Sequence, residues 1–119
     1  MQRTALVTGA TAGFGTAICR TLIENGYRVI GTGRRVARLE QLQQELGENF
    51  HFLAFDISDR QATEDAFHSL PTNWQSIDLL VNNAGLGLGL ESADKASLDD
   101  WMQMIDTNIK GLVTITRLV

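Results

Sequence analysis

Cysteine, proline and long hydrophobic runs are scarce in this chain of 119 residues, which has one cysteine and one proline. The single cysteine, Cys19, excludes an internal disulfide and a zinc site built from cysteines. Because no activating group adjoins it, we interpret Cys19 as a small buried apolar residue. No run of about 18 apolar residues occurs, so we expect no transmembrane helix and no membrane partner. The first residues also lack the apolar stretch of a signal peptide. A reducing compartment is therefore permitted, and we expect a cytoplasmic protein.

Basic residues are also few. The chain has 10 lysines and arginines against 14 aspartates and glutamates, which gives a formal net charge of -4. Because nucleic-acid-binding domains usually carry a basic excess, we expect no nucleic-acid partner. Any anion that binds must be held by a local group of residues. Hydrophobic residues make up 44% of the chain and charged residues 20%, a composition that excludes intrinsic disorder and fits one globular domain.

Short apolar runs alternate with helical patterns along the chain. The runs predict strands at residues 5–7, 27–32, 50–55 and 77–81. A helix is predicted after each strand: the first stops at Gly26, the second stops at Gly47, and the third starts with the capping-box pair Ser58 and Gln61. The fourth begins at Ser97. Because helical crossovers between parallel strands cover both faces of a sheet, this order predicts an α/β fold with a doubly wound parallel sheet.

The last predicted helix has no stop signal before Val119. A helix whose final carbonyls are uncapped at a chain end is unusual. We therefore expect residues 1–119 to be the N-terminal part of a single domain in a longer chain.

A glycine-rich segment lies between the first strand and the first helix. Gly9 permits a tight turn, Gly13 lets the backbone approach a pyrophosphate, and Gly15 lets the helix pack closely on the sheet. Free amides and the helix dipole would attract the anion, and Thr11 adds a hydroxyl donor. A strict G-x-G-x-x-G is absent, and a plain strand-to-helix turn is the alternative. The residues predicted to bind a dinucleotide here are Gly9, Ala10, Thr11, Ala12, Gly13, Phe14 and Gly15.

The end of the second strand predicts which nucleotide binds. An acidic residue at this point would hold the ribose 2′-hydroxyl, but the sequence has Gly33 followed by Arg34 and Arg35. Glycine leaves space for a 2′-phosphate, and guanidinium groups bind phosphate through paired hydrogen bonds. We therefore predict NADP rather than NAD as the cofactor. The alternative is that both arginines are solvated at a helix start.

Two further strand ends carry candidate cofactor contacts. Asp56 is placed to accept a hydrogen bond from the adenine amino group, with Ile57 against the ring; a helix-capping aspartate is the alternative. Of the adjacent Asn82 and Asn83, we expect one to tie neighbouring strands and the other to meet the cofactor. An Asx-type turn is the alternative there. The predicted contacts at this strand end are Asn83, Ala84 and Gly85.

Asn108 lies in the middle of the last predicted helix. Asparagine competes with helical hydrogen bonding, so its presence there needs a reason. A local kink that holds a water is one reason, and a tolerated surface asparagine is the alternative.

Together these residues resemble the classical short-chain dehydrogenase/reductase family over the whole chain. The motifs that carry the resemblance are Thr8-Gly9-x-x-x-Gly13-x-Gly15, Asp56, Asn82-Asn83-Ala84-Gly85 and Asn108. The residues within these motifs are similar to those of the NADP-dependent 3-hydroxy acid dehydrogenase branch, which includes serine and allo-threonine dehydrogenases. The resemblance implies a Rossmann-type sheet with strand order 3-2-1-4 and hydride transfer between NADP and a small 3-hydroxy acid or the matching aldehyde. It also implies a homotetramer formed through the helix from Ser97 onward.

The resemblance implies Asn108 as the catalytic asparagine that holds a water in a proton relay. The family's Tyr-x-x-x-Lys is absent: the sole tyrosine, Tyr27, is followed four residues later by Gly31. We therefore expect these 119 residues alone to be inactive. Two alternatives stay open, a non-catalytic nucleotide-binding module and a flavodoxin-like domain that binds a mononucleotide. No metal ligand set is expected.

Overall fold

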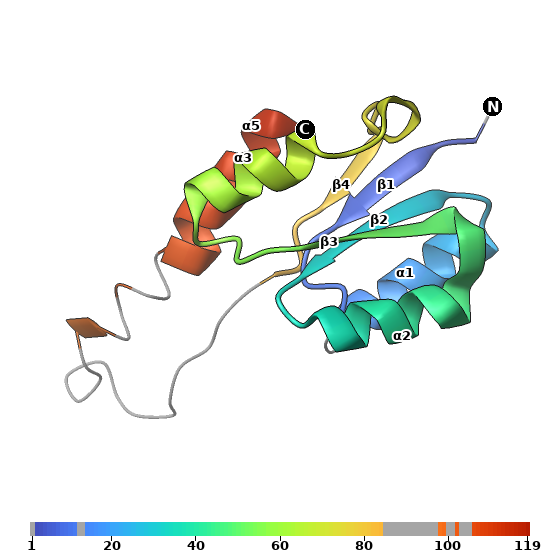
Figure 1. Ribbon diagram of the computed structural model, residues 1–119, viewed down its shortest axis with the longest axis horizontal. Helices are drawn as coiled ribbons and strands as arrows, with labels where there is room; N and C mark the ends of the chain where they lie inside the picture. The colour runs from blue at the N-terminus through green and yellow to red at the C-terminus, as the bar shows by residue number, and fades with distance from the viewer. Residues whose placement is uncertain (1, 12–13, 85–97, 100–101, 103–105) are drawn as a thin grey trace.

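The computed structural model describes residues 2–11, 14–84, 98–99, 102 and 106–119 (Figure 1). Its centre is a sheet of four parallel strands in the order β3-β2-β1-β4, which confirms the expected Rossmann-type topology. The strands are β1 (Thr4–Val7), β2 (Arg28–Gly33), β3 (Phe50–Ala54) and β4 (Leu79–Val81). The pairing aligns Val7 with Gly31 on one side and with Val81 on the other.

Helices cover both faces of this sheet, as predicted (Figure 1). One face carries α1 (Phe14–Glu24) and α2 (Val36–Leu46), and the other carries α3 (Arg60–His68) and α5 (Leu112–Leu118). Short 3₁₀ turns occur at Gly47–Asn49 and Thr72–Trp74. The helix stops at Gly26 and Gly47 are also confirmed, because both glycines have the positive φ angles that favour glycine.

The core is divided by the sheet into two clusters. Successive strand residues point to opposite faces, so Val7 and Val29 pack towards α1 and α2 while Leu6 and Ile30 pack towards α3 and α5. All four residues of β1 are buried, as expected for a central strand covered on both sides. Cys19 lies in the first cluster and is fully buried.

The predicted capping box of the third helix is wrong. The N-cap of α3 is Asp59, whose Oδ1 accepts a hydrogen bond of 3.0 Å from the Ala62 amide. Ser58 instead donates to Asp56, through its backbone N at 3.0 Å and its Oγ at 2.7 Å. The physical reason is charge: a carboxylate at the N-cap is favoured by the helix dipole.

The last predicted helix differs from a continuous α-helix. Ser97 lies outside the described residues; residues 98–99 and 102 are helical. A π-helical segment then spans Asp106–Gly111, and α5 follows directly. The departure from α-helical geometry contains Asn108, where a local kink was one of the two alternatives.

Candidate functional site

The carboxyl ends of the four parallel strands meet at one edge of the sheet. Residues 8–11 follow β1, 34–35 follow β2, 55–57 follow β3 and 82–84 follow β4. In open α/β sheets this edge is where ligands bind. The structure therefore brings the described candidate residues of the strand ends to one side of the molecule. Three predicted contacts, Ala12, Gly13 and Gly85, lie outside the described residues.

The turn after β1 requires glycine at two described positions. Gly9 has a φ of 66°, and a Cβ there would lie 2.9 Å from the Cα of Ala84. At Gly15 a Cβ would collide with the carbonyl oxygen of Gly9. The first glycine thus permits the tight turn, as the sequence predicted, and its approach to the β4 end, and the second lets α1 begin against the turn.

Thr8 joins this turn to the end of β4. Its hydroxyl donates to the Val81 carbonyl at 3.4 Å and accepts from the amides of Asn83 and Ala84 at 3.0 and 2.9 Å. Thr8 is only 1% exposed, so these bonds are shielded from water. Sequence reasoning assigned Thr8 no role, although a hydroxyl residue between a buried strand and a glycine was the available signal.

Both asparagines after β4 make structural bonds. The Asn83 side-chain amide donates to the Gly9 carbonyl at 3.1 Å, and the Asn82 amide donates to the Thr116 hydroxyl of α5 at 3.3 Å. The Asn83 bond is the side-chain tie to a neighbouring strand end that was expected of one asparagine, whereas Asn82 bonds to a helix instead. Contact between Asn83 and a cofactor stays a prediction.

Ala10 and Thr11 occupy the turn differently. Ala10 is fully buried, its amide donates to Thr32 at 2.9 Å, and its carbonyl accepts from the Thr16 hydroxyl at 2.8 Å. Thr11 is half-buried and lies against Gly33, where an added Cβ would approach its Oγ1 to 3.3 Å. The hydrogen bonds of Ala10 therefore fix the turn to β2 and α1. The Thr11 hydroxyl lies beside Gly33, near the position predicted for a 2′-phosphate.

Charges of both signs meet between β2 and β3. Burial opposes ionisation of Asp56, but the hydrogen bonds from Ser58 and the nearby Arg34 charge outweigh it and hold the pKa of the carboxyl below its usual value. Asp56 is thus a carboxylate at neutral pH and partly balances Arg34. Arg35 is exposed at the N-cap of α2. Phe14, at the start of α1, is 81% exposed and leaves an apolar ring at the same edge.

The π-helical segment packs against the β3 end. A Cβ on Gly111 would lie 2.7 Å from the carbonyl oxygen of Ile57. Sequence reasoning missed Gly111, although an isolated glycine in a helical pattern signals close approach of another backbone. Asn108 lies in this segment and its side chain is outside the description, so its catalytic role stays a prediction.

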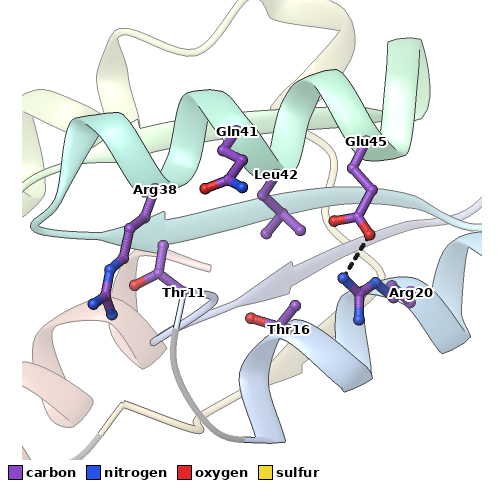
Figure 2. A pocket seen from close by; sticks show the side chains of 7 residues that line it. All are labelled: Thr11, Thr16, Arg20, Arg38, Gln41, Leu42 and Glu45. Carbon is purple, nitrogen blue, oxygen red and sulfur yellow. Dashed lines mark hydrogen bonds and ion pairs between the residues drawn. The ribbon is translucent and has the colours of Figure 1, made fainter.

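A cavity of about 250 Å³ lies between α1 and α2 (Figure 2). Its lining residues are Thr11, Thr16, Arg20, Arg38, Gln41, Leu42 and Glu45. At one end Arg20 and Glu45 form an ion pair of 2.6 Å, and at the other end Thr11 and Arg38 lie near the glycine turn. The sequence reasoning did not single out Arg38 or the cavity.

Other chemistry is limited in the described part of the chain. Burial raises the pKa of the Cys19 thiol to about 12, so at neutral pH it is protonated and a poor nucleophile. This agrees with its interpretation as a buried apolar residue. Among the described residues, no group of three or more histidine, cysteine or acidic side chains could hold a metal ion. The helices described there are too short or too polar to cross a membrane.

Comparison with known proteins decides the family. The model of the short chain dehydrogenase family matches residues 3–119. The chain belongs to the short-chain dehydrogenase family. Within that family it is 72% identical over 116 residues to a protein of Haemophilus influenzae named probable NADP-dependent dehydrogenase, covering 98% of this chain and 46% of that protein. It is 57% identical over 114 residues to the NADP-dependent 3-hydroxy acid dehydrogenase YdfG of Escherichia coli, covering 96% and 46%.

A solved short-chain dehydrogenase has the same architecture. The closed form of serine dehydrogenase complexed with NADP+ superposes with a TM-score of 0.92 at 56% identity, covering 96% of this chain and 46% of that one. The chain thus spans about half the length of the curated relatives it matches.

Proposed function

We propose that this chain is the nucleotide-binding part of an NADP-dependent oxidoreductase of the short-chain dehydrogenase family. The observation that carries the proposal is the pair formed by the turn at Gly9 and the arginines after β2, which share one edge of the sheet. The NADP dependence in the names of its relatives supports the cofactor.

The residues present fit a phosphorylated dinucleotide. Gly9, with its φ of 66°, makes the tight turn that such a loop needs, and Gly33 leaves free the space beside the Thr11 hydroxyl that a Cβ would fill. Arg34 and Arg35 supply cations for the 2′-phosphate. Asp56, held as a carboxylate, is an acceptor for the adenine amino group, and Ile57 offers an apolar contact to the ring. The remaining proposed contacts are Ala10, Ala12, Gly13, Phe14, Gly15, Asn83, Ala84 and Gly85.

The proposed reaction is oxidation of the 3-hydroxyl of a small hydroxy acid, or reduction of the matching aldehyde. When bound, NADP supplies the hydride acceptor or donor. This chain's own part is to bind and orient the cofactor at the sheet edge, and Asn108 is proposed to hold a water for proton transfer. The names of the relatives, 3-hydroxy acid dehydrogenase and serine 3-dehydrogenase, support this substrate class.

Cofactor preference is the first test. We expect NADP+ to bind at least tenfold more tightly than NAD+ to the protein of natural length, because a charge-assisted hydrogen bond contributes about 1.5–3 kcal/mol. Arg34→Ala should remove much of this preference and leave the NAD+ dissociation constant unchanged. Isothermal titration calorimetry measures both constants. Equal affinity of the unchanged protein for the two nucleotides would contradict the proposal.

Activity is the second test. The protein of natural length should reduce NADP+ with L-serine or 3-hydroxypropanoate, followed by absorbance of NADPH. Residues 1–119 alone should show no turnover, because they contain no Tyr-x-x-x-Lys. That absence also favours the second candidate function, a non-catalytic nucleotide-binding module. Tight NADP+ binding without turnover of any 3-hydroxy acid by the natural-length protein would support the module instead.

Assembly and location are further proposals. A homotetramer formed through the helix from Ser97 onward and a cytoplasmic location rest on the family resemblance and on the sequence composition. Light scattering of the protein of natural length measures the number of subunits.

A further inference from the structure

Three arginines gather at the start of α2. Arg34 and Arg35 precede the helix, and Arg38 is its third residue. Residues three and four apart lie on the same side of a helix. Helical side chains also lean towards the helix N-terminus, so Arg38 leans towards the end where Arg34 and Arg35 lie. Arg34, Arg35 and Arg38 thus place three positive charges around the start of α2.

The arginines around this cavity and at the start of α2 differ in their partners. Arg34 is near the Asp56 carboxylate, and Arg20 is paired with Glu45 at 2.6 Å. Within the described part of the chain, the side chains of Arg35 and Arg38 form no hydrogen bond or ion pair. Arg38 is exposed and therefore available to an external anion.

The cavity between α1 and α2 connects Arg38 to the predicted 2′-phosphate position. Arg38 and Thr11 line the same end of this cavity, and Figure 2 shows the Arg38 side chain extending from α2 towards the turn that holds Thr11. Thr11 in turn lies beside Gly33, with its Oγ1 3.3 Å from an added Cβ. A phosphate group that binds outside Gly33, at the mouth of this end of the cavity, would therefore lie next to the Thr11 hydroxyl and within reach of the long Arg38 side chain.

We propose that Arg38, together with the Thr11 hydroxyl, binds the adenosine 2′-phosphate and is a specificity-determining residue for NADP over NAD. A phosphate monoester carries a charge of about -1.5 to -2 at neutral pH. Arg34 shares its charge with Asp56, so Arg34 and Arg35 leave part of the phosphate charge unbalanced. The planar guanidinium of Arg38 supplies the missing donors. The inference rests on the proposed cofactor and extends it to a residue on α2.

The test compares Arg38→Gln with Arg20→Gln, a matched control that removes an arginine from the other end of the same cavity. Calorimetry on the protein of natural length measures dissociation constants for NADP+, NAD+ and adenosine 2′,5′-bisphosphate, a probe without nicotinamide. Arg38→Gln should weaken NADP+ and the bisphosphate about tenfold and change NAD+ less than twofold. The NADP+ dissociation constant of Arg38→Lys should lie between those of the unchanged protein and Arg38→Gln, because lysine keeps the charge and loses the paired donors. Arg20→Gln should bind all three like the unchanged protein.

Two results would overturn the inference. If Arg38→Gln binds NADP+ and the bisphosphate as tightly as the unchanged protein does, Arg38 does not contact the 2′-phosphate. If it weakens NADP+ and NAD+ equally, its effect is on the fold of the turn and not on the phosphate. Failure of the proposed function is distinguishable, because the unchanged protein itself would then show no preference for NADP+.

Discussion

Thr8 illustrates how one side chain fixes the sheet edge at which the carboxyl ends of the strands meet. Its single hydroxyl donates to Val81 and accepts from the amides of Asn83 and Ala84. These partners are 73 to 76 residues away in the sequence. The Asn83 side chain adds a fourth bond to the neighbouring Gly9. The position of the turn after β1 is therefore set by the end of β4.

Thr8→Val tests this role. Valine has nearly the shape of threonine but cannot accept hydrogen bonds, so the Ala84 amide loses its partner, while the Asn83 amide keeps its bond of 3.0 Å to the Val81 carbonyl. Leaving a buried donor unsatisfied costs about 1–3 kcal/mol. We expect the free energy of unfolding in urea to fall by about that amount and NADP+ binding to weaken. Thr21→Val, at an exposed position of α1, is the control and should change stability by less than about 0.5 kcal/mol. Equal effects of the two variants would contradict the bracing role.

Residue chemistry at the strand ends was partly predictable from the sequence. The choice of NADP followed from neighbouring residues, Gly33, Arg34 and Arg35, and it agrees with the names of the relatives. Which partner each of Asn82 and Asn83 binds could not be predicted, because it depends on which segments the fold brings next to them. Arg38 was missed for the same reason: its position beside Thr11 exists only once α2 packs across from α1.

At the scale of elements, the π-helical segment Asp106–Gly111 forms a contact that a regular helix pattern does not reveal. It packs on the β3 end through Gly111, whose missing side chain makes room for the Ile57 carbonyl. Asparagine in the middle of a helical pattern left a local kink open as one of two readings, and π-helical turns are frequent at functional sites. The packing partner was not predictable, since nothing local to Gly111 specifies Ile57.

Gly111→Ala distinguishes this contact from simple helix propensity. Alanine in place of glycine within a helix stabilises it by about 1 kcal/mol. The added Cβ here would lie 2.7 Å from the Ile57 oxygen, so the backbone must shift. We expect the free energy of unfolding to fall by about 1–3 kcal/mol, as for other overpacked sites. Thermal and urea denaturation measure the change, and a stabilised variant would show that the segment does not pack closely on β3.

The start of α3 shows where local patterns compete. Ser58 and Gln61 have the spacing of a capping box, yet Asp59 caps the helix and Ser58 bonds to Asp56. With three residues able to cap within four positions, spacing alone does not decide between them. The charged side chains take the helix start and the turn before it, because carboxylates accept stronger hydrogen bonds than hydroxyls do.

At the scale of the whole molecule, the alternation of apolar runs and helical patterns predicted the layered fold. Strands on both sides of β1 are confirmed in the order β3-β2-β1-β4. The strand limits moved by one or two residues, as with β2, which spans Arg28–Gly33 rather than residues 27–32. The fold could be predicted because it depends on periodicity, which is a property of the sequence. Contacts such as the one between Thr8 and Asn83 depend on the register between strands, which the sequence pattern does not specify, so only the structure reveals them.

The bond between Asn83 and Gly9 also has a consequence for how the protein is made. The two residues are 74 positions apart, so a ribosome exposes the first turn long before the amide that holds it. Until β4 has been synthesised and has docked beside β1, nothing from that strand end can fix the conformation of the glycine turn. The proposed binding of NADP therefore requires β4, and it becomes possible only after the first three strands have emerged.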